Sequence, residues 1–243
     1  MSNLGNIHSI ETFGAFDGPG VRYVLFLQGC PFKCQFCHNR DTWDTSVNTI
    51  KSVEEIYYDF RKYRSFYQKG GITVSGGEPL LQIDFLIQLF KYFKSHGIHT
   101  AIDTAGSTFN ELYKPRFDEL MQYTDLVMLS IKHMDENIHK KLVGGSNKQV
   151  LAFAKYLSDI QKPVYIRHLL LPTITDTREN LTALKEFLFT LSNIEKIEVL
   201  PYHKKGIVKW ERLSLSYELK DIPEPSSEDV KKVSVFLNEA INR

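Results

Sequence analysis

The stretch VRYVLFLQGCPFKCQFCHNRDTW, residues 21–43, joins an apolar segment to a polar loop that holds every cysteine of the chain. Its first nine residues are rich in β-branched, aromatic and leucine side chains and predict a buried strand. The loop that follows carries Cys30, Cys34 and Cys37 in the spacing C-x3-C-x2-C. The stretch therefore predicts a strand whose C-terminal end leads directly into a chemically reactive loop.

Five further segments are similar to this strand, and amphipathic segments separate them. They are GITVSGG from Gly71, IHTAIDT from Ile98, DLVMLSIK from Asp125, PVYIRHLLL from Pro163 and KIEVLPYH from Lys196. Ser52-x-x-Glu55 predicts a helix capping box, and apolar residues 85, 86, 89, 90 and 93 have helical spacing before Gly97. Alternating strands and helices are typical of parallel βα units. Because only six units fit, we predict an α/β fold, an incomplete (β/α)6 TIM-like barrel with parallel strands that is open on one side.

The C-terminal part of the chain has a different pattern. Residues 204–226, KKGIVKWERLSLSYELKDIPEPS, predict an irregular tail. A final helix is expected after Ser226, with apolar residues 230, 233, 236, 237 and 241 on one face. No linker composition interrupts the chain, so we predict a single domain over residues 1–243, with a core at about 5–209 and a C-terminal extension at 210–243.

The overall charge and composition limit the possible partners. Thirty basic and 29 acidic residues give a formal charge of +1, which argues against nucleic acid or an anionic membrane as a partner. The N-terminal residues MSNLGNIHSI lack the features of a secretion signal, and the longest apolar runs are far too short to span a membrane. An odd number of clustered cysteines in such a chain indicates a reducing compartment. We therefore expect a cytoplasmic protein, and a monomer.

Three clustered thiols admit several explanations. Simple burial is disfavoured, because polar residues such as Lys33, Gln35 and Asn39 surround the cysteines. A structural zinc site needs a fourth ligand, and a thioredoxin-like pair would leave one cysteine unused. Four-iron clusters normally take four thiolates, so three thiolates would leave one iron open to a substrate or cofactor. We favour this last interpretation.

Polar residues also follow the other predicted strands at their C-terminal ends, where α/β barrels gather their chemistry. They are Ser75, Gly76, Gly77, Glu78 and Pro79 after the second strand, Asp103 and Thr104 after the third, Ser130 and Lys132 at the fourth, Arg167 on the fifth and His203 after the sixth. Each alone has an ordinary structural explanation. Together they suit a zwitterionic amino acid joined to a nucleoside: the two cations would meet a carboxylate, and the two acids an ammonium group or ribose hydroxyls.

At this point the sequence resembles the radical S-adenosylmethionine enzymes. Within them it is similar to the activating enzymes of glycyl-radical enzymes, and most of all to the group whose partner is pyruvate formate-lyase. The cysteine spacing carries the wider resemblance. The narrower one depends on Asp17-Gly-Pro-Gly-x-Arg22 and on CHNRDTWD, SGGEP, GIHTAIDT, TDLVMLSIK, LVGGSN and IEVLPYH, and it extends from about Gly5 to Lys209. The absence of further cysteines favours the short type without an inserted ferredoxin-like domain.

The resemblance implies a 4Fe–4S cluster on Cys30, Cys34 and Cys37, with S-adenosylmethionine on the open iron. It implies cofactor contacts from Phe36, Cys37, His38, Gly76, Gly77, Glu78, Asp103, Thr104, Ser130, Ile131, Lys132, Arg167 and His203. It implies partner contacts from Asp17, Gly18, Pro19, Gly20 and Arg22. Where the family usually has Asp-x-Lys, this chain has Ser130-Ile131-Lys132, so a neutral hydroxyl replaces a carboxylate at the implied site of a monovalent cation.

The resemblance also implies an activity. An oxidoreductase of this kind takes an electron from reduced flavodoxin or a similar donor and cleaves S-adenosylmethionine reductively. It then abstracts a glycine Cα hydrogen from a loop of pyruvate formate-lyase (formate C-acetyltransferase), which installs a glycyl radical for anaerobic glucose and pyruvate metabolism. Two alternatives are another small radical S-adenosylmethionine enzyme acting on a metabolite and a non-catalytic iron–sulfur module. The Asp17–Arg22 segment argues against the first, and the set of polar strand ends against the second.

Overall fold

The computed structural model describes residues 2–241 and divides into two compact units. Unit 1 contains the residues up to Pro31 together with Thr42–Met128, and unit 2 contains Phe32–Asp41 and the residues from Leu129 onward. The cysteine loop therefore belongs to both units, with Cys30 in unit 1 and Cys34 and Cys37 in unit 2. That residues 1–243 form a single domain stays a prediction.

The strands form an open, mostly parallel sheet, as predicted. Within the described residues its order is β3-β1-β2-β4-β5-β6-β7-β8. The six predicted strands are β2 (Arg22–Leu27), β4 (Gly71–Gly76), β5 (His99–Thr104), β6 (Leu126–Ser130), β7 (Val164–Leu170) and β8 (Ile194–Pro201). The pairs β2–β4, β4–β5 and β7–β8 are parallel.

Two strands were not predicted. β1 (Leu4–Gly14) pairs antiparallel with both β2 and β3 (Thr49–Ser52). Buried and more exposed positions alternate along the first half of β1, and all of β3 is at least partly exposed. Neither segment therefore has the continuous apolar run that marks a buried parallel strand. They extend the parallel sheet at its β2 edge.

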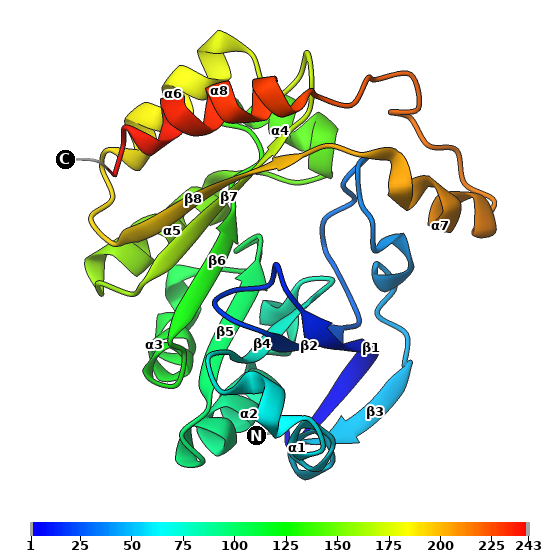
Figure 1. Cartoon of the computed structure of the whole chain (residues 1–243), viewed down its shortest axis with the longest axis vertical. Coiled ribbons are helices and arrows are strands. Elements are labelled where there is room, and N and C mark those ends of the chain that lie inside the picture. The colour runs from blue at the N-terminus through cyan, green and yellow to red at the C-terminus, as the bar shows by residue number, and fades with distance from the viewer. Residues whose placement is uncertain (1, 242–243) are drawn as a thin grey trace. The chain divides into compact units, whose positions relative to one another are not determined.

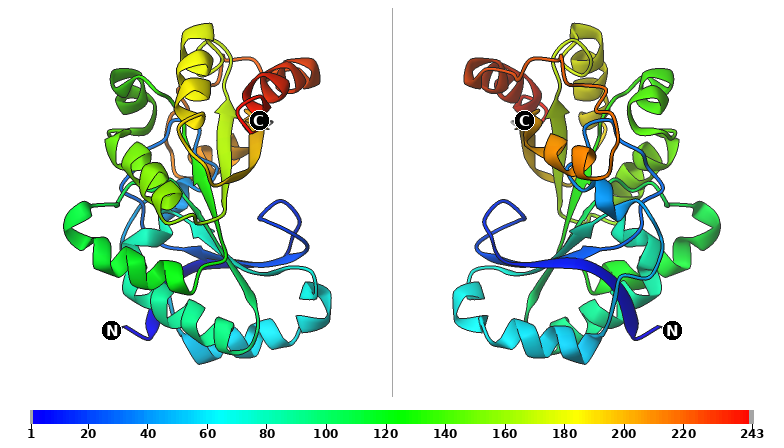
Figure 2. Two further views of the ribbon diagram at one scale, coloured as in Figure 1. Left: turned by 90° about the vertical axis from the view of Figure 1, so that its left-hand side faces the viewer. Right: turned by 90° about the vertical axis from the view of Figure 1, so that its right-hand side faces the viewer.

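Helices cover one face of the strands in unit 1. They are α1 (Val53–Arg61), α2 (Ile83–Ser95) and α3 (Lys114–Gln122), with short 3-10 turns η2 (Arg64–Tyr67), η3 (Pro79–Gln82) and η4 (Glu111–Tyr113). Figures 1 and 2 show α1 and α2 side by side along the strands. The predicted capping box of Ser52 and Glu55 is present, and α2 ends just before Gly97, whose φ of 70° is left-handed.

The two faces of the unit 1 strands have different roles. Tyr23 points toward the helices and contacts Phe60 of α1, with ring centroids 5.7 Å apart. Because side chains alternate along a strand, Arg22 lies on the opposite face. Thr73 and His99 contact Arg22 from the neighbouring strands β4 and β5. This second face carries the polar groups of the candidate site.

Unit 2 contains β7, β8 and the remaining helices. These are α4 (Glu136–Val143), α5 (Lys148–Asp159), α6 (Arg178–Leu188), α7 (Ile207–Arg212) and α8 (Ser227–Asn238). The 3-10 turn η5 (Lys204–Gly206) precedes α7, and η1 (Arg40–Thr42) follows the cysteine loop. In Figure 1, α8 lies beside α6, and it also contacts β8.

The C-terminal predictions are partly confirmed. Ser226 caps α8 in a capping box with Asp229, and Leu237 is fully buried, but α8 ends before residue 241. The expectation of an irregular tail at 204–226 is wrong in its first part, because η5 and α7 form there. A helix of six residues is too short to show periodicity in the sequence. No helix within residues 2–241 has the length and apolar character needed to cross a membrane.

Candidate active site

The cysteine loop in unit 2 is attached to the C-terminal end of α4. The Lys33 amide donates to Val143 O at 2.7 Å and the Gln35 amide to Leu142 O at 3.0 Å. The last carbonyl groups of a helix have no partner within the helix. Here the loop amides satisfy two of them, which fixes the backbone on both sides of Cys34.

The three cysteines offer a donor set suited to an iron–sulfur cluster. All are present as thiols; Cys34 is 8% exposed and the other two are half-buried. Thiolates are the ligands that iron–sulfur clusters take. Within residues 2–241, no three His, Cys, Asp or Glu side chains form a preformed metal site. That the three thiols are the cluster ligands stays a prediction from their chemistry and spacing.

Two histidines stack beside the cysteine loop in unit 2. The rings of His38 and His203 have centroids 4.2 Å apart, and His38 Nε2 lies 3.2 Å from His203 O. Burial, followed by the proximity of His203, lowers the pKa of His38 and so favours the neutral ring. His203 Nδ1 is buried without a hydrogen-bond partner among the described residues. A bound ligand would satisfy this atom, so the pair fits the predicted cofactor contacts.

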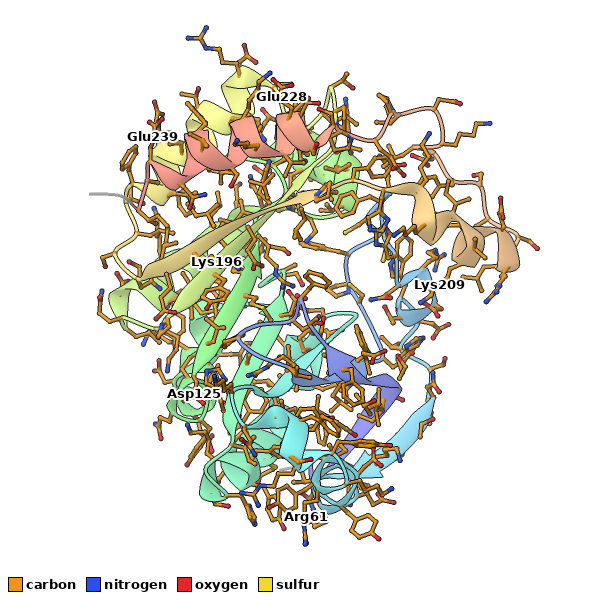
Figure 3. The ribbon with its side chains drawn as sticks, viewed as in Figure 1. Arg61, Asp125, Lys196, Lys209, Glu228 and Glu239 are labelled. Carbon is orange, nitrogen blue, oxygen red and sulfur yellow. The ribbon has the colours of Figure 1, made fainter. Side chains whose placement is uncertain are left out.

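Trp210 is a contact of the cysteine loop that the sequence did not indicate. Its indole Nε1 donates to Cys37 O at 2.9 Å, and the side chain is 7% exposed. The neighbouring Lys209, labelled in Figure 3, contacts Asp41 at 3.1 Å and so also joins α7 to the cysteine loop. The sequence assigned Trp210 to a weaker extension. A tryptophan within a polar segment was the one available signal, because tryptophan is usually buried.

We expect Trp210→Phe to weaken retention of the cluster. The phenyl ring keeps most of the packing but loses the hydrogen bond to Cys37 O, so iron release to a chelator should become about threefold to tenfold faster. Release is followed by absorbance of the reconstituted protein. Tyr202→Phe is the matched control, because it removes one hydrogen bond, 2.9 Å long, to Leu219 O of the same C-terminal segment. Unchanged release from Trp210→Phe would show that this hydrogen bond does not hold the loop.

In unit 1, the SGGEP turn packs directly against the residues before Cys30. The Glu78 amide donates to Gly29 O at 2.8 Å, and the Gly77 amide donates to Leu27 O at 3.0 Å. A Cβ atom on Gly77 would lie 2.0 Å from Gly29 O, and Gly76 has φ of 115°. Glycine is required at both positions, one for close approach and one for its backbone conformation.

The Glu78 carboxylate joins the ends of β4 and β5. It is 1% exposed and accepts hydrogen bonds from Thr104 Oγ1 at 2.5 Å and from Ala105 N and Ser107 Oγ at 3.1 Å each. Burial raises its pKa, whereas these hydrogen bonds oppose the rise. Asp103 is held separately by Ser75 Oγ at 3.1 Å. The Glu78 carboxylate therefore positions the predicted contact Thr104 at the end of β5.

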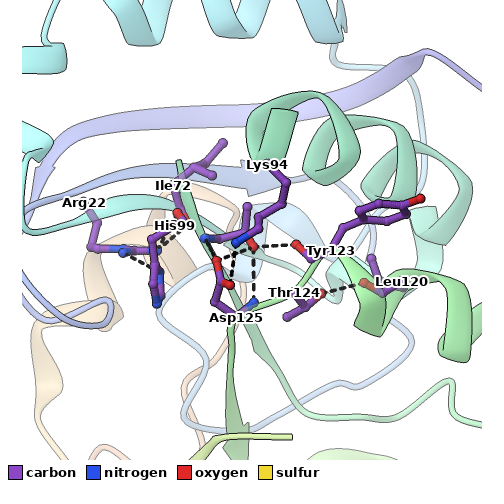
Figure 4. A network of polar contacts seen from close by, with 9 residues as sticks. Arg22, Ile72, Lys94, His99, Leu120, Tyr123, Thr124 and Asp125 are labelled. Atoms are coloured by element: carbon purple, nitrogen blue, oxygen red, sulfur yellow. Dashed lines mark hydrogen bonds and ion pairs between the residues drawn. The ribbon is translucent and has the colours of Figure 1, made fainter. Parts of the chain in front are cut away.

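Arg22, at the end of the Asp17–Arg22 segment, contacts Ile72 and His99 inside unit 1 (Figure 4). Arg22 is completely buried, and its guanidinium contacts Thr73 Oγ1 at 2.9 Å, Ile72 O at 2.5 Å and His99 Nδ1 at 3.1 Å. Thr73 Oγ1 in turn donates to Asp17 O at 2.6 Å. Residues 17–20 are at least partly exposed. Any contribution of Arg22 to partner binding is thus through the loop that it holds.

Predicted residues in unit 2 also gather around the end of β6. The Ile131 amide donates to Arg167 O at 2.9 Å. The Arg167 side chain is 8% exposed and forms an ion pair with Glu198 at 2.9 Å, so its carboxylate partner lies within its own chain. Ser130 and Lys132 are half-buried.

The structure thus places the predicted site residues in three groups. In unit 2, one group contains Cys34, Cys37, His38 and His203, and a second contains Ser130, Ile131, Lys132 and Arg167. In unit 1, the third group contains Cys30, Gly76, Gly77, Glu78, Asp103 and Thr104.

The fold and the cysteine loop define an enzyme of the radical S-adenosylmethionine class. Residues 24–184 match the model of the Radical SAM superfamily. S-adenosylmethionine-bound SuiB from Streptococcus suis has the same fold, with a TM-score of 0.65, 18% identity and coverage of 87% of this chain and 45% of that one. A domain of pyruvate-formate lyase-activating enzyme from Bacteroides vulgatus gives a TM-score of 0.57 at 29% identity, covering 70% of this chain and 94% of that one.

Two relatives identify the family within this class. The pyruvate formate-lyase-activating enzyme of Staphylococcus epidermidis is 46% identical over 96% of this chain and 95% of its own length. That of Listeria monocytogenes is also 46% identical, over 96% of both chains. This chain belongs to the family of pyruvate formate-lyase-activating enzymes. Membership implies a 4Fe–4S cluster and S-adenosylmethionine as cofactors.

Proposed function

We propose that this chain activates pyruvate formate-lyase by removing one hydrogen from a glycine Cα of that partner. The observation that carries the proposal is the joint presence of the cysteine loop and the Asp17–Arg22 segment in a chain 46% identical to enzymes named for this activity. The anchored Asp17–Gly20 loop supports a contact with a second protein, because its backbone is fixed while its surface is partly exposed.

The residues of the site have separable tasks. The cluster and S-adenosylmethionine, when bound, supply the radical chemistry. Cys30, Cys34 and Cys37 would hold the cluster as thiolates. Gly77 allows close approach of the backbone, and Lys132 offers a positive charge to a carboxylate. The Arg167 side chain is paired with Glu198, and the main-chain carbonyl of Arg167 would help to fix the backbone of Ile131.

The electron donor, the oligomeric state, the cellular compartment and a bound cation are also proposals. We infer that a reduced flavodoxin or a similar small carrier donates the electron, that the chain works as a monomer, and that it acts in the cytoplasm. A monovalent cation near Ser130 remains a prediction, and the neutral hydroxyl would bind it weakly.

The function is tested with the reconstituted protein under anaerobic conditions. Mixed with pyruvate formate-lyase, S-adenosylmethionine and a reductant, it should produce a glycyl radical signal in electron paramagnetic resonance. A pyruvate formate-lyase whose radical glycine is replaced by alanine should give none. Turnover with a metabolite but not with the partner would indicate the first alternative, a different radical S-adenosylmethionine enzyme. Failure to bind S-adenosylmethionine would indicate a non-catalytic module.

A further inference from the structure

Residues 131–135, which connect β6 to α4 in unit 2, are neither helix nor strand. Backbone groups in such a segment need partners from elsewhere when they are buried. Here the partners are three polar side chains from β7, α6 and the start of α5: His168, Asn180 and Asn147. They are 0%, 4% and 3% exposed, respectively. We call these three residues the clamp.

The clamp contacts several backbone groups of the segment. His168 Nδ1 lies 2.8 Å from Ile131 O, and Asn180 Oδ1 accepts from the Met134 amide at 2.9 Å. Asn147 Nδ2 donates to His133 O at 3.1 Å and to Met134 O at 2.7 Å. The segment is therefore held along most of its length.

Two of the clamp residues, His168 and Asn180, also approach the same carbonyl oxygen. His168 Nε2 lies 3.3 Å from Thr175 O, and Asn180 Nδ2 donates to the same carbonyl oxygen at 2.7 Å. The shorter contact assigns the ring proton of His168 to Nδ1, which then donates to Ile131 O. Loss of this donor would leave a buried carbonyl without that partner and loosen the segment.

Lys132 is the lysine of the segment, and the segment's acidic residue, Asp135, caps α4 by accepting from the Ile138 amide. His133 is buried, and burial lowers its pKa, whereas Lys132 is half-buried and lies between Ser130 and Met134. A lysine has a long and flexible side chain, so it binds an anion well only if its backbone is held in place. The clamp supplies that restraint directly on both sides of Lys132.

We propose that His168, supported by Asn147 and Asn180, is a positioning residue that presents Lys132 to the carboxylate of S-adenosylmethionine. The proposal rests on the proposed function. His168 does not touch the cofactor; it acts through the carbonyl of Ile131. Because the clamp orders the segment before S-adenosylmethionine binds, binding costs less conformational entropy and the affinity is higher.

The test compares two buried histidines of unit 2. His168→Phe keeps the size of the ring and removes the donor to Ile131 O. His139→Phe is the matched control, because His139 is 1% exposed and its Nδ1 contacts Gly145 O at 2.7 Å, outside the clamped segment. We expect His168→Phe to raise the Kd for S-adenosylmethionine about fivefold to tenfold, and His139→Phe to leave it within about twofold, while both lower Tm.

Two further measurements separate positioning from general loss of stability. In the protein without cofactors, hydrogen exchange of the amides at residues 131–135 should become about tenfold faster in His168→Phe and stay unchanged in His139→Phe. His168→Asn, whose amide nitrogen can replace Nδ1 as the donor, should restore most of the affinity. In a Lys132→Met background, His168→Phe should weaken binding little further, because the two changes remove the same interaction.

Three results would overturn the proposal: wild-type affinity in His168→Phe, equal losses in His168→Phe and His139→Phe, or fully additive losses in the Lys132→Met background. Failure of the wild-type protein to bind S-adenosylmethionine would instead overturn the proposed function. The hydrogen-exchange comparison would then still decide whether the clamp restrains the segment.

Discussion

Replacing any one of Cys30, Cys34 and Cys37 with alanine should abolish the 4Fe–4S cluster and lower cleavage of S-adenosylmethionine by about a thousandfold or more. The chain has three cysteines in all, so no spare thiolate can substitute. With two thiolates, a four-iron cluster loses one of the few bonds that hold it, and the iron is lost. Iron and sulfide content and the yield of deoxyadenosine measure the two effects.

The control for this experiment lies in the same loop. Gln35→Ala removes a side chain that contacts Glu218 at 2.5 Å but leaves the thiols and the Gln35 amide unchanged. It should retain the full cluster and nearly normal turnover. A single cysteine variant that kept a complete cluster and normal turnover would refute the assignment of the three ligands.

Gly77→Ala is expected to cause the second largest loss. The added Cβ would lie 2.0 Å from Gly29 O and 3.2 Å from Cys30 Cβ, so the backbone before Cys30 must move. Such overpacking costs about 1–3 kcal/mol of stability, and displacement of a ligand-bearing loop should reduce activity about a hundredfold. Deoxyadenosine formation and the free energy of unfolding are measured on the same preparation.

Gly97→Ala controls for the conformational cost of replacing a glycine. Gly97 has a φ of 70°, and a Cβ there would meet nothing within 4 Å. This variant should lose about 1–2 kcal/mol of stability, the cost of the left-handed conformation, with normal activity. If Gly77→Ala and Gly97→Ala were equally active, the contact between the SGGEP turn and the cysteine loop would have no catalytic importance.

Much of the architecture followed from local patterns in the sequence. All six apolar segments are strands, and the capping residues Ser52 and Ser226 start their helices as predicted. These signals are local because burial on both faces needs a continuous apolar run, and a capping box needs residues only three positions apart. β1, β3 and α7 lack such signals. Their hydrogen-bonding or packing partners, not their composition, decide that they form.

For the candidate site too, some features followed from local sequence and others only from tertiary contacts. The sequence alone determined the class of chemistry, because the spacing of the three thiols lies within one short loop. Only the tertiary structure placed Arg22 inside unit 1, gave Glu78 its partners at the end of β5, and brought Trp210 to Cys37. These contacts join residues separated by 26 to 173 positions along the chain. A hydrogen bond requires a donor and an acceptor to lie close together in space, and the periodicity of neither segment predicts that proximity.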